Sequence, residues 1–122
     1  MASVIVIDDE ASMRDTLTQM LIRDGHSVAT AENGISAMEA IQNHNFHLAI
    51  IDILMPGKDG IETMVELKKI SPSTKIIAMS GGRRNISADF NLDSAHLLGA
   101  DGVLKKPFNW NELRQALEAV WK

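Results

Sequence analysis

Short apolar runs alternate with longer amphipathic stretches along the whole chain. Five runs rich in Val, Ile, Leu and Ala have the length of strands, at residues 3–7, 26–31, 48–52, 75–79 and 102–105. The run at 48–52 has no polar residue before Asp52, which is typical of a strand buried on both faces of a parallel sheet. The hydrophobic pattern therefore predicts five strands in a largely buried sheet.

Helices are expected between these strands, at about 12–23, around 35–41, at 61–67, near 88–98 and from Asn109 onward. Ser12 with Asp15, and Asn109 with Glu112, have the spacing of a capping box at a helix start. Apolar residues three or four positions apart predict the faces that these helices bury. These residues are Met13, Leu17, Leu21, Ile35, Met38, Ile41, Ile61, Met64, Val65, Leu67, Leu113, Leu117 and Val120.

Strands that alternate with helices predict an α/β fold, with a doubly wound parallel sheet and helices on both faces. The chain has 122 residues, which suits one domain and is too short for an eight-unit barrel of roughly 200 residues or more. No linker, low-complexity tract or internal sequence repeat divides it. We therefore expect residues 1–122 to form a single domain.

The amino-acid composition indicates where the protein acts but says little about the reaction it takes part in. The formal net charge is −4, and no basic block points to direct contact with nucleic acid or with an anionic membrane. The absence of cysteine excludes disulfides and thiolate metal sites and favours a cytoplasmic protein. The N-terminal residues carry neither a signal peptide nor an apolar stretch of membrane-spanning length.

Candidate functional residues lie at the carboxyl ends of the predicted strands. Asp8 and Asp9 follow the first strand, Asp52 ends the third, Ser80 follows the fourth and Lys106 follows the fifth. Ligands of parallel α/β sheets bind at that edge. A carboxylate has a pKa near ~4, so Asp52 is an anion at neutral pH and can attack phosphorus without a general base. Neighbouring acids, a hard cation such as Mg²⁺, a lysine and a hydroxyl would suit phosphoryl transfer.

These residues resemble the receiver domain of bacterial two-component response regulators. The resemblance rests on Asp8-Asp9, on Asp52 within the segment that ends in Asp59-Gly60, on Ser80, and on Lys106-Pro107-Phe108. Each motif alone is weak, because an acidic pair after a strand often only favours the helix that follows it. Together, in this order and each at a strand end, they cover essentially the whole chain.

The resemblance implies both a fold and a set of residue roles. The family's sheet has the order 2-1-3-4-5. Asp52 would accept phosphate from a histidine kinase or a histidine phosphotransfer protein. Mg²⁺ or Mn²⁺ would be bound by Asp9, Asp52 and the Leu54 carbonyl, with Asp8 acting through water. Lys106 and Ser80 would stabilise the phosphoryl group, and the peptide bond before Pro107 would be cis.

The sequence does not indicate how a phosphorylated receiver of this kind would pass its signal to a target. Many receivers carry a switch aromatic at the position of Val103, and valine cannot perform that rotation. No output domain is recognisable in the sequence, which leaves two alternatives: a single-domain regulator acting on an unidentified protein target, or a piece of a longer regulator. Direct binding to nucleic acid or to a membrane is not expected.

The alternative functions belong to other α/β families. A haloacid-dehalogenase-like phosphatase or phosphotransferase also uses an Asp nucleophile and Mg²⁺, but it requires a second Asp where this chain has Leu54. A flavodoxin-like or nucleotide-binding module would carry a glycine-rich fingerprint after the first strand, which is missing here. We therefore expect an acceptor that labels only itself rather than an enzyme with multiple turnovers.

Overall fold

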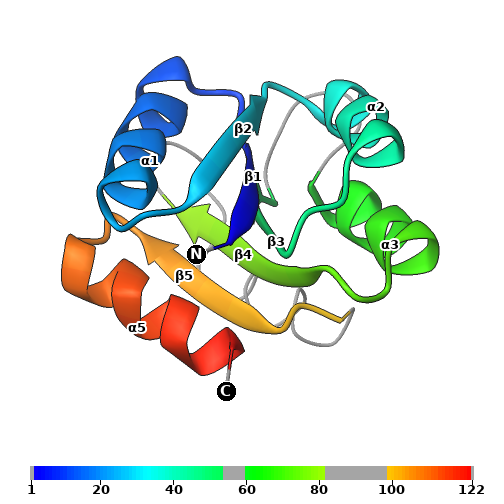
Figure 1. Ribbon diagram of the computed structural model, residues 1–122. Helices are drawn as coiled ribbons and strands as arrows, with labels where there is room; N and C mark the ends of the chain where they lie inside the picture. Colours follow the sequence, from blue (N-terminus) through cyan, green and yellow to red (C-terminus); the bar gives the residue numbers. More distant parts are fainter. Residues whose placement is uncertain (1, 54–59, 82–98, 122) are drawn as a thin grey trace.

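A computed structural model describes residues 2–53, 60–81 and 99–121 of the chain (Figure 1). In these segments strands and helices alternate, as the hydrophobic pattern predicts. The elements are β1 (Ser3–Ile7), α1 (Ala11–Arg23), β2 (Ser27–Ala31), α2 (Gly34–Asn43), β3 (Leu48–Asp52), α3 (Gly60–Ile70), β4 (Lys75–Gly81), β5 (Gly102–Lys106) and α5 (Trp110–Val120). The helix expected near 88–98 lies outside the described residues.

The five strands form one parallel sheet in the order β2-β1-β3-β4-β5. This confirms the expected fold class and strand order. In the register of the sheet, Ile7 lies opposite Ile51 and Asp52 lies opposite Met79. The carboxyl ends of β1 and β3 therefore lie side by side at the centre of the sheet.

Helices cover both faces of the sheet, with α1 and α5 on one face and α2 and α3 on the other (Figure 1). Strand β1, which lies next to the central strand β3, sends Val4 and Val6 into the core beneath α1 and α5, and Ile5 and Ile7 into the opposite core. All four side chains are fully buried. Burial on both faces explains why the central strands are continuous apolar runs.

The start of α5 agrees with the sequence prediction. The Asn109 side chain accepts a hydrogen bond from the Glu112 amide at 2.9 Å, and the Glu112 carboxylate accepts one from the Asn109 amide at 3.0 Å. This is the predicted capping box. Further along the helix, Leu113, Leu117 and Val120 are buried against the sheet, as expected.

Two helix predictions are wrong. The first helix begins at Ala11 with Glu10 as its N-cap residue, and no side chain caps it, so Ser12 and Asp15 form no capping box. Ile35 was expected in the core but is 64% exposed. The buried face of α2 is formed by Gly34, Ala37, Met38 and Ile41. Ile35 follows Gly34 directly, and one residue along a helix turns the side chain about 100° away from that face.

Predicted strand ends differ from the observed ones by one or two residues. β2 begins at Ser27, β4 continues to Gly81, and β5 continues to Lys106. Ser80 and Lys106 are therefore strand residues rather than residues that follow a strand. Within the described segments, no helix has the length and apolar character needed to cross a membrane.

Candidate functional site

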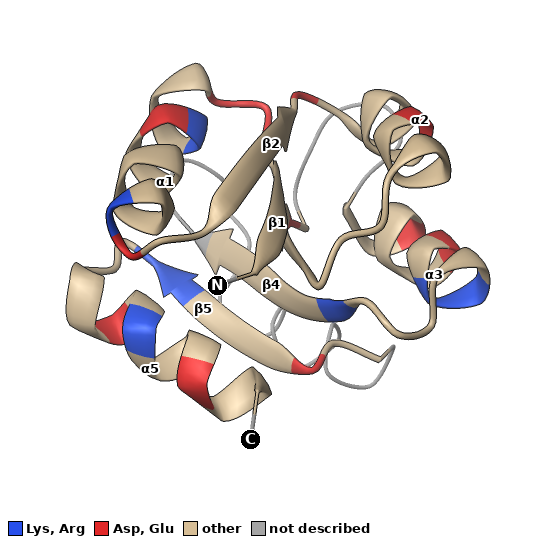
Figure 2. Ribbon diagram, viewed as in Figure 1, with Lys and Arg blue, Asp and Glu red and all other residues tan. Residues whose placement is uncertain are grey.

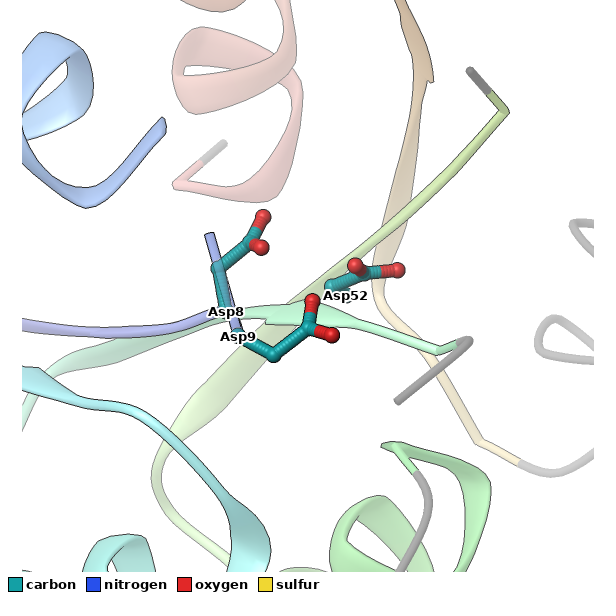
Figure 3. A group of neighbouring side chains, drawn as sticks. All are labelled: Asp8, Asp9 and Asp52. Atoms are coloured by element: carbon teal, nitrogen blue, oxygen red, sulfur yellow. The ribbon is translucent and has the colours of Figure 1, made fainter. Parts of the chain in front are cut away.

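Three carboxylates meet at the carboxyl end of the two central strands (Figure 3). Asp8 and Asp9 follow β1 directly, and Asp52 is the last residue of β3. Each offers a carboxylate oxygen, and these oxygens lie within 4.8 Å of one another. Asp8 is fully buried and Asp52 is only 5% exposed. The fold therefore holds like charges together with little access to water, which raises their energy unless a cation is present.

Lys106, the last residue of β5, supplies one such cation. Its Nζ atom lies 2.8 Å from Asp8 Oδ2 and 3.3 Å from Asp52 Oδ2. The Glu10 carboxylate is more distant, at 3.9 Å. Figure 2 shows the acidic colour in the connection between β1 and α1 and the basic colour at the head of the β5 arrow. Lys106 thus connects an outer strand of the sheet to the acidic centre.

The ionisation of Lys106 is set by two opposing effects. Burial alone would lower the pKa of its ammonium group. The hydrogen bond to Asp8, the negative charge of Asp52, the charge of Asp8 and the hydrogen bond to Asp52 outweigh burial and raise the pKa above its ordinary value. Lys106 therefore remains charged at neutral pH and partly neutralises the cluster.

Every polar group of Asp8 has a partner. Its amide donates to the Ala31 carbonyl at 3.1 Å. Its Oδ1 atom accepts from the Glu10 amide at 2.9 Å, and its Oδ2 atom accepts from Lys106. Its carbonyl accepts from Arg14 Nη1 at 2.8 Å. Sequence reasoning did not select Arg14, because a single basic residue in an amphipathic helix has no distinguishing pattern.

Ser80 lies close to the cluster but is not linked to it. It is fully buried in β4, one residue beyond Met79, which lies opposite Asp52. Its Oγ atom makes no hydrogen bond within the part of the chain that the structure describes. A buried hydroxyl without a partner is costly, so Ser80 retains a donor that a ligand at this edge could use.

Three further positions were predicted from the family resemblance: Pro107, Val103 and Leu54. The peptide bond between Lys106 and Pro107 is cis, as the family resemblance implies. Val103 lies in β5 opposite Ala78 and packs, partly buried, against the core beneath α2 and α3. Leu54, whose carbonyl was expected to bind metal, lies outside the described residues.

Gly60 is a further residue on which the site depends. A Cβ atom added there would overlap the Asp52 carbonyl oxygen and the Cα atom of Ile53. The first residue of α3 thus packs directly against the backbone that carries Asp52. In the sequence, Asp59-Gly60 stands out as a turn signal and as the end of the acceptor motif, whereas its close approach to the Asp52 backbone is a tertiary feature.

The donor set fits a hard divalent cation. Asp8, Asp9 and Asp52 offer only carboxylate oxygens, which Mg²⁺ and Mn²⁺ accept readily and softer metals do not prefer. Two of these acids are buried, so a bound cation would relieve repulsion that water cannot screen. Of the three, Asp8 uses both carboxylate oxygens in hydrogen bonds within the protein.

A comparison with known proteins identifies the family of a segment that includes the acidic cluster and Lys106. Residues 4–118 match the family model of the response regulator receiver domain. The chain belongs to this family. The receiver domain is 32% identical to the chemotaxis protein CheY of Halobacterium salinarum, over 96% of this chain and 94% of that protein. It is also 32% identical to the CpxR homolog, a transcriptional regulatory protein of Haemophilus influenzae, over 98% of this chain.

Solved structures give the same assignment for the receiver domain. The Vibrio cholerae chemotaxis protein CheY4 superposes with a TM-score of 0.86 at 30% identity, covering 98% of each chain. The response regulator TrrA of Thermotoga maritima, solved in complex with Mg²⁺ and BeF, superposes with a TM-score of 0.84 at 32% identity. That match covers 98% of this chain and 99% of TrrA.

Relatives of the receiver domain differ in length. The chain spans 50% of the CpxR homolog and 24% of the DNA-binding transcriptional regulator NtrC of Azospirillum brasilense, but 94% of CheY from Halobacterium salinarum. The family therefore includes both receiver domains within longer regulators and receivers that make up nearly a whole protein.

Proposed function

We propose that this receiver domain accepts a phosphoryl group on Asp52 from a histidine kinase or a histidine phosphotransfer protein, with Mg²⁺ or Mn²⁺ as cofactor. The observation that carries the proposal is the position of Asp52, buried beside the Lys106 ammonium group and the carboxylates of Asp8 and Asp9. The TrrA complex with Mg²⁺ and BeF supports the choice of metal.

The residues of the site divide the chemistry between them. An Asp52 carboxylate oxygen forms a bond to phosphorus, while the bond to the donor imidazole breaks and its electron pair stays on nitrogen. Lys106 stays charged and lies 3.3 Å from Asp52 Oδ2, beside the carboxylate that reacts. The Ser80 hydroxyl, which has no partner among the described residues, would donate to a phosphoryl oxygen. The metal, held by Asp9 and Asp52 with Asp8 beside them, would offset the remaining negative charge.

The proposed output is a change in partner binding rather than turnover of a substrate. Phosphorylated Asp52 would shift a pre-existing equilibrium between two conformations, so that a target protein recognises one of them. Val103 lies in β5 without an aromatic ring, so the shift would involve other groups. We propose that the protein acts in the cytoplasm, where kinases and phosphotransfer proteins would meet it.

Chemical labelling with acetyl phosphate tests the acceptor directly. We expect the wild-type protein with Mg²⁺ to gain one phosphoryl group by intact mass, and Asp52→Asn to gain none. Asp15→Asn, which removes an exposed carboxylate on α1, is the matched control and should label as wild type does. EDTA should prevent labelling. Persistent labelling of Asp52→Asn would contradict the assignment, and so would release of phosphate from small esters over many turnovers.

A further inference from the structure

Arg14 is a basic residue that contacts the turn carrying Asp8 and Asp9 without joining the acidic cluster itself. It is the fourth residue of α1, and its Nη1 atom donates to the Asp8 backbone carbonyl at 2.8 Å. This contact links a helix side chain to the backbone between two of the three clustered acids. It is neither a salt bridge nor a metal ligand.

The carbonyl that Arg14 holds belongs to the peptide unit that joins Asp8 to Asp9. A peptide unit is planar, so fixing its carbonyl oxygen also fixes the amide of the following residue. The orientation of this plane, together with that of the following plane, whose Glu10 amide is held by Asp8, determines the direction in which the Asp9 side chain leaves the backbone. Arg14 can therefore set the position of the Asp9 carboxylate without touching it.

Hydrogen bonds also hold the groups on either side of this peptide plane. The Asp8 amide is held by Ala31, and its carboxylate by Glu10 and Lys106. Beyond it, the Glu10 carbonyl accepts the Arg14 amide at 3.1 Å, where α1 begins. Arg14 thus holds the turn at two points, through its backbone and through its guanidinium group.

The location of Arg14 is not explained by helix stability. A positive charge in the first turn of a helix is unfavourable with the helix dipole, which prefers acidic residues there. Helix α1 has no acidic residue in its first turn and no side-chain cap. A cation at this place is better explained by the acidic turn in front of the helix.

We propose that Arg14 is a positioning residue of the phosphoryl-transfer site, which aims the Asp9 carboxylate at the metal by holding the peptide plane between Asp8 and Asp9. The inference rests on the proposed function, because it concerns the metal that Asp9 and Asp52 would share. The acidic cluster itself would bind the metal. Arg14 lies outside the cluster and would change the affinity of the cluster for the metal. Groups that orient metal ligands commonly change affinity by about 10- to 100-fold.

Binding of Mn²⁺, followed by the electron paramagnetic resonance signal of the free ion, tests the inference without any phosphoryl chemistry. Arg14→Met keeps the apolar stem of the side chain and removes the donor. We expect it to weaken Mn²⁺ binding about tenfold or more. Arg14→Lys, which keeps a donor and the charge, should recover part of the loss. Arg23→Met, on an exposed residue in the last turn of the same helix, should bind as wild type does.

A purely structural role would give a different result. Urea unfolding of each variant separates lost stability from lost affinity, and we expect Arg14→Met to remain fully folded under the binding conditions. The inference is overturned if Arg14→Met binds Mn²⁺ as tightly as Arg23→Met, or if its affinity falls only in proportion to an unfolded fraction. If wild-type protein binds Mn²⁺ but acetyl phosphate fails to label Asp52, the proposed function fails while the Arg14 contact stands.

Discussion

At the residue scale, Lys106 is the group on which the electrostatics of the site depend. It is 8% exposed and lies between Asp8 and Asp52, which are themselves buried. Removing one partner of a buried ion pair leaves an uncompensated charge in a medium that solvates it poorly. The three acids would then repel one another without the cation that the fold provides.

Lys106→Met should therefore destabilise the metal-free protein at pH 7, by about 3–5 kcal/mol. Because the pKa of Lys106 is raised in the folded state, its contribution is fully present below the unfolded value of about 10.4 and is lost as pH rises through the folded pKa. The gap between wild type and Lys106→Met should thus close in strong alkali. Urea unfolding at pH 7 and at a pH above the raised pKa of Lys106 measures it.

Lys105→Met is the matched control, since Lys105 is the exposed neighbour in the same strand. It should change stability little at either pH. Equal stability of the Lys105 and Lys106 variants at pH 7 would mean that the buried ion pairs contribute nothing.

The site residues differ in how visible they are in the sequence. Asp8, Asp9 and Asp52 follow apolar runs, so the edge of a parallel sheet was enough to bring them together. Arg14 could not be found in this way, because its partner is a backbone carbonyl six residues away and carbonyls leave no pattern in a sequence.

At the element scale, α1 and α5 begin in contrasting ways. The capping box of Asn109 and Glu112 closes the start of α5 through local side chains. In α1 the side chain of N-cap residue Glu10 makes no such bond. Instead Asp8 Oδ1 accepts the Glu10 amide from outside the helix. The start of α1 is thus held by the functional site rather than by the helix's own residues.

This contrast predicts different costs for two similar substitutions. Asn109→Ala should lower the free energy of unfolding by about 1 kcal/mol, within a usual range of roughly 0.5–2 kcal/mol. Ser12→Ala should cost nearly nothing, since Ser12 caps no helix in the structure. Asn111→Ala changes an exposed asparagine, the second residue of α5, and controls for the loss of an asparagine side chain that caps no helix. A cost for Ser12→Ala equal to that of Asn109→Ala would contradict the observed start of α1.

Element types were predictable here and element ends were not. Alternating apolar runs and amphipathic stretches identified all the described strands and helices. The capping box at Ser12 was wrong because a capping residue must stand where the helix begins. Helix α1 begins earlier, with Glu10 as its N-cap residue, and the Glu10 amide is held by Asp8. Ile35 was misread because a helix face is defined only once the sheet beneath it is in place.

At the scale of the whole molecule, Asp101, which directly precedes β5, links α3 and β4 to the start of that strand. Its Oδ2 atom accepts from Lys68 Nζ of α3 at 2.8 Å and from the Ile76 amide of β4 at 2.9 Å. Burial would raise the pKa of Asp101, but the hydrogen bonds from Lys68 and Ile76, together with the charges of Lys68 and Lys75, lower it below the usual value.

A lowered pKa in the folded state gives stability that is present above the unfolded value of about 3.9 and is lost as pH falls through the folded pKa. Asp101→Asn should therefore be less stable than wild type at pH 7, by about 1–2 kcal/mol for a partly exposed pair. The difference should shrink in strong acid. Urea midpoints at pH 7 and near pH 2 measure it, with Asp15→Asn as control. A difference that does not change with pH would contradict the role of the Asp101 charge.

The global order of the sheet followed from the family resemblance, while the alternation of elements alone predicted only an α/β class. Ties such as Asp101 to Lys68, which are 33 positions apart in the chain, are invisible to pattern reasoning. They depend on the register that packing selects.

The contact between Lys106 and Asp8 has a consequence during synthesis of the chain on the ribosome. These residues are 98 positions apart, and synthesis proceeds at roughly 5–20 residues per second. The acidic turn therefore leaves the ribosome several seconds before its lysine does. During that interval the central strands can pair, yet their carboxyl edge holds clustered negative charge without this counter-ion. The acidic cluster of a nascent receiver domain thus lacks its lysine until β5 has been synthesised.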